Sequence, residues 1–326
     1  MRRFLLPLVA GALALAGAFA VLGTMLRPVN AAGPSQIVVI PRGGSVTGIG
    51  EQLAAAGLIR SRAAFVLAAR LRGVSARLQH GEYALSPAFS TLEILDRIAR
   101  GRVVLHRLTI PEGYTAAQIA RTLAARGLGH GEAFRRLARQ GGDRFRFAWL
   151  GGRADLEGYL FPDTYLLPRG LGPEEIAARF LMRFEERVLP RARGAAPGAL
   201  GETVIIASMV EREARVPAER AVIAGVIRNR LRKGWPLEID ATVLYALGRT
   251  SGPLTTADLQ VDSPYNTYRR TGLPAGPICN PGLAAISAAL RPAEVPYLFY
   301  VLRPDGSHEF SRTFEEHLRA IRRWRP

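Results

Sequence analysis

Two carboxylates two residues apart, Glu211 and Glu213, lie where a helix suited to acid–base chemistry is expected to end. Residues 203–231 predict two helices that meet at Pro217, because proline suits the first helical turn and disrupts a helix interior. Glu213 follows Met209 by four residues and shares the apolar face, whereas Glu211 lies about 200° away around the axis. Apolar surroundings raise a carboxyl pKa, as a proton donor near neutral pH requires. We predict Glu213 as the acid, with Glu211 as second choice and a solvated helix face as the alternative.

Polar and aromatic side chains gather in three later stretches, 238–248, 261–282 and 298–317. The middle stretch holds four prolines and three glycines between Ser263 and Gly282, which excludes a helix or a central strand. Loops on a rigid scaffold are common binding surfaces, and Asn, Tyr, Thr and Asp side chains can hydrogen-bond sugar hydroxyls. We therefore predict a binding surface rather than a disordered linker, which would lack the aromatic and apolar residues.

The composition limits the kinds of site that the chain can carry. Its net charge of +17, almost wholly from arginine, favours polyanionic neighbours, although a merely solvated arginine-rich surface is the alternative. The single cysteine, Cys279, excludes an intrachain disulfide and a Cys-based metal cluster. The five histidines are scattered without HxxxH or HExxH spacing. We predict neither a metal nor a cofactor.

The N-terminus predicts export. Arg2 and Arg3 precede twenty-three uncharged residues, Phe4–Leu26, and about 20 apolar residues span a bilayer as a helix. The positive-inside rule places the two arginines in the cytoplasm. A cleaved signal peptide, with its small-residue site at 29–31, is the alternative. We predict a single-pass transmembrane helix with the body outside the cytoplasmic membrane, which makes nucleic acid a poor partner.

The first soluble region contains a repeat at an offset of 70 residues. Residues 40–58 align without gaps on residues 110–128, and each copy predicts a strand, a Pro-x-Gly turn and a helix that begins after Ser45 or Thr115. Two copies are too few for a solenoid. Further predicted elements are a helix over 63–71, a strand over 81–85, and helices over 91–99, from 132, and over 173–188.

These elements predict an α+β fold with a strand–helix–helix–strand core in its first module. We place the N-terminal tip and span in residues 1–30, a small module resembling the LysM carbohydrate-binding fold in 36–150, and a mixed α/β domain with the helix-borne glutamate in 151–326. The aromatic residues of 156–168 are expected on a loop or edge strand, because two prolines forbid a regular helix there. Aromatic side chains that could stack on sugars in the first module are Tyr83, Phe89 and Tyr114.

Six motifs together resemble one known family. They read ASMVEREA, PAERAVIAGVIRNRL, LEIDATVLYALG, DSPYNTYRRTGLPAGPICNPG, YLFYVLRPDGSHEFSRTFEEH and LEGYLFPDTYLL. This set strongly resembles the YceG-like endolytic murein transglycosylases, and the likeness runs from the apolar N-terminus to about Arg319. Ala241 stands where the family usually has proline, a small loop change. The resemblance implies cleavage of nascent peptidoglycan glycan strands beside the membrane, and it implies that Glu213 is the essential glutamate.

The implied reaction needs one carboxylic acid. Glu213 would protonate the oxygen between N-acetylmuramic acid and N-acetylglucosamine, and the 6-hydroxyl of the muramic acid would then attack its own anomeric carbon to form a 1,6-anhydro end. Side chains must also position the sugar and stabilise oxocarbenium-like charge. We assign these tasks to Glu211, Asn229, Arg230, Asp240, Thr242, Tyr265, Asn266, Thr267, Tyr268 and Asn280, although each alone could instead fix a loop.

Two other functions fit the same residues. A non-catalytic, membrane-anchored scaffold would bind glycan strands without making anhydro ends. A muramidase hydrolase would need a second carboxylate near Glu213, for which Asp240 and Asp262 are candidates. The expected partners are peptidoglycan glycan strands and the cytoplasmic membrane, with cell-wall synthases as further contacts.

Overall fold

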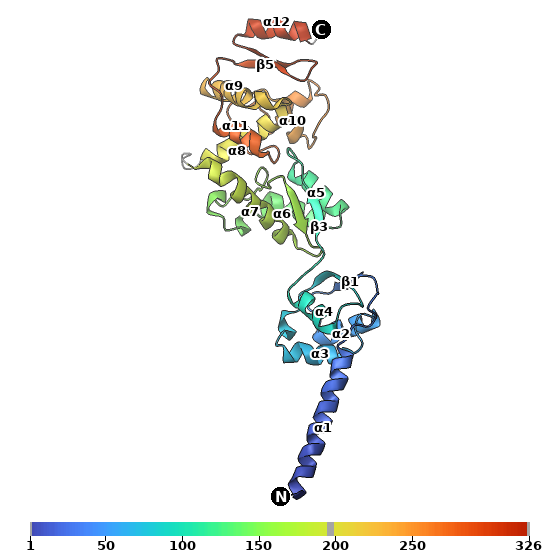
Figure 1. The fold of residues 1–326 in the computed structure, drawn as a ribbon. Helices are drawn as coiled ribbons and strands as arrows, with labels where there is room; N and C mark the ends of the chain where they lie inside the picture. The colour runs from blue at the N-terminus through green and yellow to red at the C-terminus, as the bar shows by residue number, and fades with distance from the viewer. Residues whose placement is uncertain (1, 194–198, 325–326) are drawn as a thin grey trace. The chain divides into compact units, whose positions relative to one another are not determined.

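The computed structural model describes residues 2–193 and 199–324. It divides into two compact units (Figure 1). Unit 1 comprises the chain up to His106 together with Leu166–Gly170, and unit 2 comprises Arg107–Tyr165 and the residues from Leu171 onward. Helices combine with small two-stranded sheets in the described residues, which confirms the predicted α+β class.

Unit 1 has the predicted strand–helix–helix–strand order. Val38 pairs with Tyr83 in an antiparallel sheet of β1 and β2, and both side chains are buried. Alternate β1 residues face the core, as a sheet with one covered face requires. The elements of this unit are α1 (Arg2–Met25), β1 (Gln36–Ile40), α2 (Val46–Ala55), α3 (Arg62–Leu71), β2 (Gly81–Leu85) and α4 (Thr91–Ala99).

The helix ends follow the local sequence signals. The Ser45 hydroxyl accepts a hydrogen bond from the Gly48 amide at 3.0 Å, so it caps α2. Thr115 forms a reciprocal capping box with Gln118 at the start of α5 (Ala116–Ala125). Gly57 follows α2 with a φ of 67°, a backbone conformation that favours glycine. Both copies of the repeat therefore form the expected strand, turn and helix.

The predicted membrane span falls on α1. Among the residues that the structure describes, no helix is both long enough and apolar enough to cross a membrane. The span over 4–26 is therefore not supported.

The predicted domain limit near residue 150 does not coincide with the division between the units. The second copy of the repeat belongs to unit 2, where α5 packs against α6 (Gly131–Gln140) and α6 packs against α7 (Pro173–Ala192). β3 (His106–Thr109) and β4 (Thr164–Leu167) form a two-stranded sheet, and the unit boundary runs through both strands. The similarity of the two repeat copies suggested that they belong to one module, but each copy packs in a different unit.

Unit 2 is built around α8 (Ala199–Glu213), whose residues from Thr203 to Val210 are all buried. A helix that is apolar all round is expected inside a core. α8 packs against α11 and α9, while α12 covers the hairpin of β5 and β6 (Figure 1). The remaining elements of this unit are α9 (Arg220–Arg232), α10 (Asp240–Ala246), α11 (Leu283–Leu290), β5 (Phe299–Leu302), β6 (His308–Ser311) and α12 (Phe314–Trp324).

Short 3-10 turns link several of these elements. The turn Pro217–Glu219 separates α8 from α9, as the predicted break at Pro217 requires. The others are Ser75–Arg77, Gly142–Arg144, Ala148–Leu150 and Asp258–Gln260.

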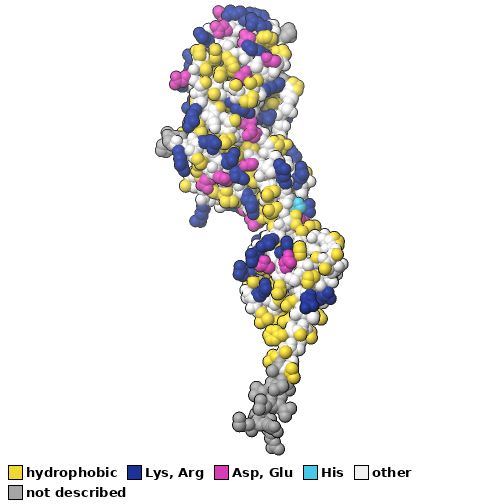
Figure 2. Space-filling view, viewed as in Figure 1, with side chains coloured by type: hydrophobic (Ala, Val, Ile, Leu, Met, Phe, Trp, Pro, Cys, Tyr) yellow, Lys and Arg dark blue, Asp and Glu magenta, His cyan; other side chains and the backbone are white. Residues whose placement is uncertain are grey.

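Positive charge is dispersed on the face shown in Figure 2. Lysine and arginine side chains are interspersed there with acidic ones and do not form a single continuous stripe. A continuous basic stripe is the usual electrostatic footprint of a nucleic-acid-binding surface.

Candidate active site

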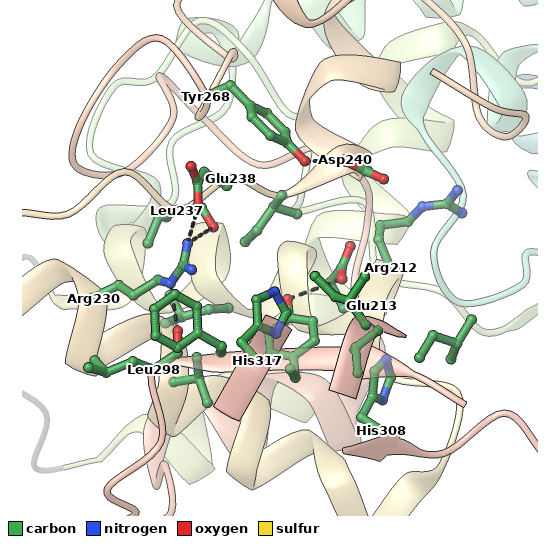
Figure 3. A pocket seen from close by; sticks show the side chains of 18 of the residues that line it. Arg212, Glu213, Arg230, Leu237, Glu238, Asp240, Tyr268, Leu298, His308 and His317 are labelled. Atoms are coloured by element: carbon green, nitrogen blue, oxygen red, sulfur yellow. Dashed lines mark hydrogen bonds and ion pairs between the residues drawn. The ribbon is translucent and has the colours of Figure 1, made fainter. Parts of the chain in front are cut away.

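Glu213, the last residue of α8, lies in a pocket of about 440 Å³ in unit 2. Figure 3 shows its carboxylate facing this pocket, with Asp240 and Tyr268 above it in the view. α9 contributes Arg230, and β5, β6 and α12 close the remaining sides. The pocket thus joins segments that are far apart in sequence around one carboxylate.

Glu213 has the environment that its helical position predicts. Burial raises the pKa of its carboxyl to about 7, and the nearby charge of Asp240 adds to the rise. Tyr300 donates a hydrogen bond to Oε2 of Glu213 at 3.1 Å, which favours the carboxylate and limits the rise. A carboxyl with this pKa can both give and accept a proton near neutral pH.

Two other predicted site residues, Asp240 and Tyr268, line this pocket, and their polar groups are not buried in the core. The Tyr268 hydroxyl donates a hydrogen bond to Oδ1 of Asp240, and both residues line the pocket (Figure 3). Asp240 is the first residue of α10, where the partial positive charge of a helix N-terminus stabilises a carboxylate. A second carboxyl group therefore lines the same pocket as Glu213.

Arg230 lines the pocket, but its guanidinium is used by the protein itself. It donates to the carbonyl oxygens of Leu298 at 2.7 Å, Leu237 at 3.0 Å and Pro236 at 3.1 Å. It also pairs with Glu238 at 2.9 Å. Glu238 has a φ of 53°, a strained conformation for a residue with a side chain. Arg230 therefore fixes the pocket wall, and its predicted contact with substrate stays a prediction.

Five further residues that were predicted to contact substrate use their side chains for hydrogen bonds within the protein. Asn229 donates to the Val295 and Tyr297 carbonyls at 2.7 and 2.9 Å, and it does not line the pocket. The others have side chains that are fully buried or nearly so, which prevents contact with a ligand in this conformation; they are Thr242, Asn266, Thr267 and Asn280. Their predicted contacts with the sugar stay predictions, which this arrangement of side chains does not support.

The buried side chains hold the loops that surround α10 and the end of α8. Thr242 and Thr267 bond each other through their hydroxyls at 2.9 Å, and Thr267 accepts the Ile239 amide at 3.0 Å. Asn266 bridges within its own loop by donating to the Val261 carbonyl at 2.8 Å. The polar loops are therefore rigid supports for the pocket.

Glu211 and Tyr265 also lie away from the Glu213 pocket. Oε2 of Glu211 accepts the Gly282 amide at 3.0 Å, and burial raises the pKa of Glu211. The Tyr265 ring lies 4.9 Å from the Tyr245 ring, outside this pocket. The geometry thus favours Glu213 over Glu211 as a group that can reach a ligand.

The sequence did not reveal two residues that line the pocket, Tyr300 and His308, or the residue that holds His308, Glu219. Tyr300 and His308 line the pocket, and Nδ1 of His308 lies 2.7 Å from Oε2 of Glu219. The polar and aromatic character of residues 298–317 is the available signal in the sequence. Its strand pairing was needed to show that Tyr300 faces Glu213.

The aromatic residues proposed for glycan stacking have different surroundings. Tyr83 is fully buried and donates to the Gln79 carbonyl at 2.8 Å, so it cannot stack on a sugar here. Phe89 is half-buried beneath the Arg97 guanidinium, 4.0 Å from the ring centre. Tyr114, also half-buried, belongs to unit 2. Within the described residues, His, Cys, Asp and Glu form no group of three that could hold a metal.

A profile of the YceG-like family matches residues 38–323. The chain belongs to this family. The family resemblance predicted from the motifs is therefore confirmed.

Three relatives place the chain within this family. It is 31% identical over 325 residues to the endolytic murein transglycosylase of Bacillus subtilis strain 168, across 94% of this chain and 90% of that protein. It is 31% identical over 331 residues to the endolytic murein transglycosylase of Streptococcus pneumoniae serotype 2 strain D39, across 91% of this chain but 60% of that protein. The crystal structure of a YceG-like protein from Listeria monocytogenes matches with a TM-score of 0.60 and 30% identity, across 89% of this chain and 100% of that chain.

Proposed function

We propose that this protein is an endolytic peptidoglycan lytic transglycosylase that cleaves the β-1,4 bond between N-acetylmuramic acid and N-acetylglucosamine. The observation that carries the proposal is Glu213, which faces a polar pocket and whose pKa is raised to about 7 by burial. The names of the bacillary and pneumococcal relatives support the same substrate class.

In the proposed first step, protonated Glu213 gives its proton to the glycosidic oxygen as the bond from that oxygen to the anomeric carbon breaks. A pKa of about 7 leaves about half of the molecules protonated at pH 7. Positive charge then develops at the sugar ring, and the exposed Asp240 carboxylate in the same pocket stabilises it.

In the second step, the 6-hydroxyl oxygen of the muramic acid bonds to its own anomeric carbon, and its proton passes to the Glu213 carboxylate. Atoms and charge balance without water, and Glu213 is protonated again for another turnover. Attack within one sugar gains from proximity, which can be worth several kcal/mol. The hydrogen bond from Tyr300 holds the carboxylate in place between the two steps.

Digestion of purified peptidoglycan strands tests the proposal. Wild-type protein should release 1,6-anhydro ends that mass spectrometry detects, and Glu213→Gln should reduce their release by about 10²–10⁴-fold at pH 7. Glu202→Gln is a matched control, because Glu202 is an exposed glutamate on the same helix. Equal activity of Glu213→Gln and wild type would refute the assignment, and loss of activity only in Glu211→Gln would move the role to Glu211.

A hydrolase is the second candidate, because Asp240 lines the same pocket as Glu213. Two carboxylates across one pocket are the usual requirement for glycoside hydrolysis. Asp262 does not line this pocket and pairs instead with Arg270 at 3.1 Å. Hydrolysis would give reducing ends that are heavier than anhydro ends by one water, so the same mass spectra separate the two reactions.

We also propose that the body acts outside the cytoplasmic membrane, where peptidoglycan lies, attached through the apolar N-terminal residues. The support is the uncharged sequence of 4–26 behind two arginines. Fractionation of cells tests this: the protein should stay with membranes through a high-salt wash, and recovery in the soluble fraction would contradict attachment. Contact with cell-wall synthases and the LysM-like character of unit 1 stay predictions from the sequence.

A further inference from the structure

A second pocket, of about 610 Å³, lies in unit 2 between α5, α6 and the end of α10. It shares no lining residue with the Glu213 pocket, and the mechanism above makes no use of it. Its chemistry is nevertheless distinctive, because an apolar floor is surrounded by arginines.

The floor of the second pocket is lined by short apolar side chains. Five alanines from α5 and α10 line it: Ala116, Ala117, Ala120, Ala124 and Ala246. Gly131 lets α6 approach α5 closely, because a Cβ there would lie 2.6 Å from the Ala120 carbonyl oxygen. Such a surface of methyl groups can cover apolar parts of a ligand, alanyl methyl groups among them.

The rim of the pocket carries four arginines, of which two are occupied. Arg135 pairs bidentately with Glu132 at 2.8 and 3.0 Å, and Arg249 pairs with Asp258 at 3.3 Å. The other two, Arg121 and Arg139, are exposed, and among the described residues neither has a hydrogen bond or ion pair; the charge of Arg139 does act on the nearby Asp155 carboxyl, where it limits the rise in pKa that burial causes. Unpaired guanidinium groups beside one pocket are suited to carboxylate ligands.

Glu157 lines the base of the pocket, and its carboxyl group does not repel a bound anion. Oε1 and Oε2 of Glu157 both accept the Ala116 amide, at 3.0 and 3.1 Å, and Asn280 donates to Oε1 at 2.8 Å. Burial raises the pKa of Glu157 to about 8, so the group is mostly neutral at pH 7. The pocket therefore presents positive charge over a neutral base.

The two pockets are adjacent. α10 begins at Asp240 in the first pocket and ends at Ala246 in the second, a length of about 10 Å. Arg212 lines the first pocket and donates to the carbonyl of Thr250, which lines the second. Figure 3 shows the Arg212 side chain extending away from Glu213 at this edge. A peptide of three extended residues is also about 10 Å long, so such a peptide can reach from one pocket to the other.

We propose that the second pocket binds the alanine-containing, carboxylate-bearing peptide attached to the muramic acid, while the sugar itself lies beside Glu213. This inference rests on the proposed function and deepens it, because it makes the protein selective for glycan strands that carry peptides. Arg121 and Arg139 bind the peptide carboxylates, and the alanine floor takes the alanyl methyl groups.

Binding of a free peptide tests this directly. The probe is L-Ala-γ-D-Glu-meso-diaminopimeloyl-D-Ala, titrated calorimetrically into the full-length protein at neutral pH. The double variant Arg121→Ala/Arg139→Ala should bind about tenfold or more weakly, since two charge-assisted contacts are lost. Ala124→Phe should weaken binding without a change of charge, because Ala124 is an exposed lining residue. Arg136→Ala is the matched control, because Arg136 is an exposed α6 arginine that does not line this pocket.

A second measurement separates this inference from the proposed function. The ratio of kcat/KM on peptide-bearing strands to that on strands stripped of peptide should exceed 1 for wild type and for Arg136→Ala, and should fall to about 1 for the double variant. Equal peptide affinity in all variants, or an equal loss in Arg136→Ala, would overturn the inference even if anhydro ends are still released. If neither the wild-type protein nor any variant cleaves a strand, the proposed function fails. The peptide-binding measurement still decides which ligand the second pocket takes.

Discussion

The hydroxyl of Tyr300 on β5 lies 3.1 Å from Oε2 of Glu213 at the end of α8, although 87 residues separate the two in sequence. Tyr300 stays a phenol, because burial raises its pKa well above the ordinary value. It is therefore a fixed donor to the carboxylate form of Glu213. Together with Asp240, it sets the pH range in which Glu213 can act.

Tyr300→Phe should extend activity to higher pH. The change removes a hydrogen bond that stabilises the carboxylate, so the pKa of Glu213 should rise further, by about 1 unit. The alkaline limb of the kcat/KM profile, which follows loss of the proton from Glu213, should move up by the same amount. An unchanged alkaline limb would show that the bond to Tyr300 does not tune the acid.

Asp240→Asn should move the same limb in the opposite direction. The negative charge of Asp240 raises the pKa of Glu213, and its removal lowers that pKa by a few tenths of a unit, because Asp240 is exposed and screened. Asparagine can still accept the hydrogen bond from Tyr268. A transglycosylase should keep measurable activity in this variant, whereas complete loss would favour the hydrolase with Asp240 as its second carboxylate.

Glu157 should make folding stability depend on pH. Its pKa is raised from 4.5 to about 8 in the folded protein, so the folded state binds more protons than the unfolded state between these values. The stabilising contribution is complete below pH 4.5 and is lost as pH rises through 8, a change on the order of 5 kcal/mol.

Denaturant unfolding of wild type and Glu157→Gln at pH 5, 6.5 and 8 checks this expectation. Because glutamine does not titrate, the stability of the variant relative to wild type should rise with pH. Glu202→Gln, at an exposed site, should follow wild type throughout. A constant difference between Glu157→Gln and wild type would contradict the raised pKa.

Arg230→Met should destabilise the fold rather than weaken substrate contact alone. The change leaves the carbonyls of Leu298, Leu237 and Pro236 without their donor, which should cost about 2–4 kcal/mol of unfolding free energy. Arg232→Met, at an exposed position of the same helix, should stay within about 0.5 kcal/mol of wild type. Normal stability with only a raised KM would restore the substrate role predicted from sequence.

Local signals predicted the elements well. The strand Gly81–Leu85 and the helix Thr91–Ala99 have the predicted limits, and α8 and α9 are separated at Pro217 as expected. Capping residues, proline and glycine act on neighbours within a few positions, so the local sequence is enough to determine where a helix begins and ends. The desolvation of Glu213 was predictable for the same reason, because it follows from the spacing of apolar residues along one helix.

The roles of the loop residues could not be predicted in this way. Asn266 and Asn280 beside prolines look the same whether an amide contacts a ligand or fixes a loop. The decision depends on distant partners, such as the Leu160 amide that donates to Asn280 at 2.8 Å across 120 residues. The division between the units was missed for a related reason, since the packing partner of α5 is not encoded in the repeat itself.

The final turn of α8 sends Glu211 to the amide of Gly282 and Glu213 to the pocket. A disturbance that unwinds this turn would release the 280–282 loop and displace the acid in one event. Variants that disturb this turn should therefore lose activity and the order of the 280–282 loop together. A second substitution that restores one of the two should also restore the other.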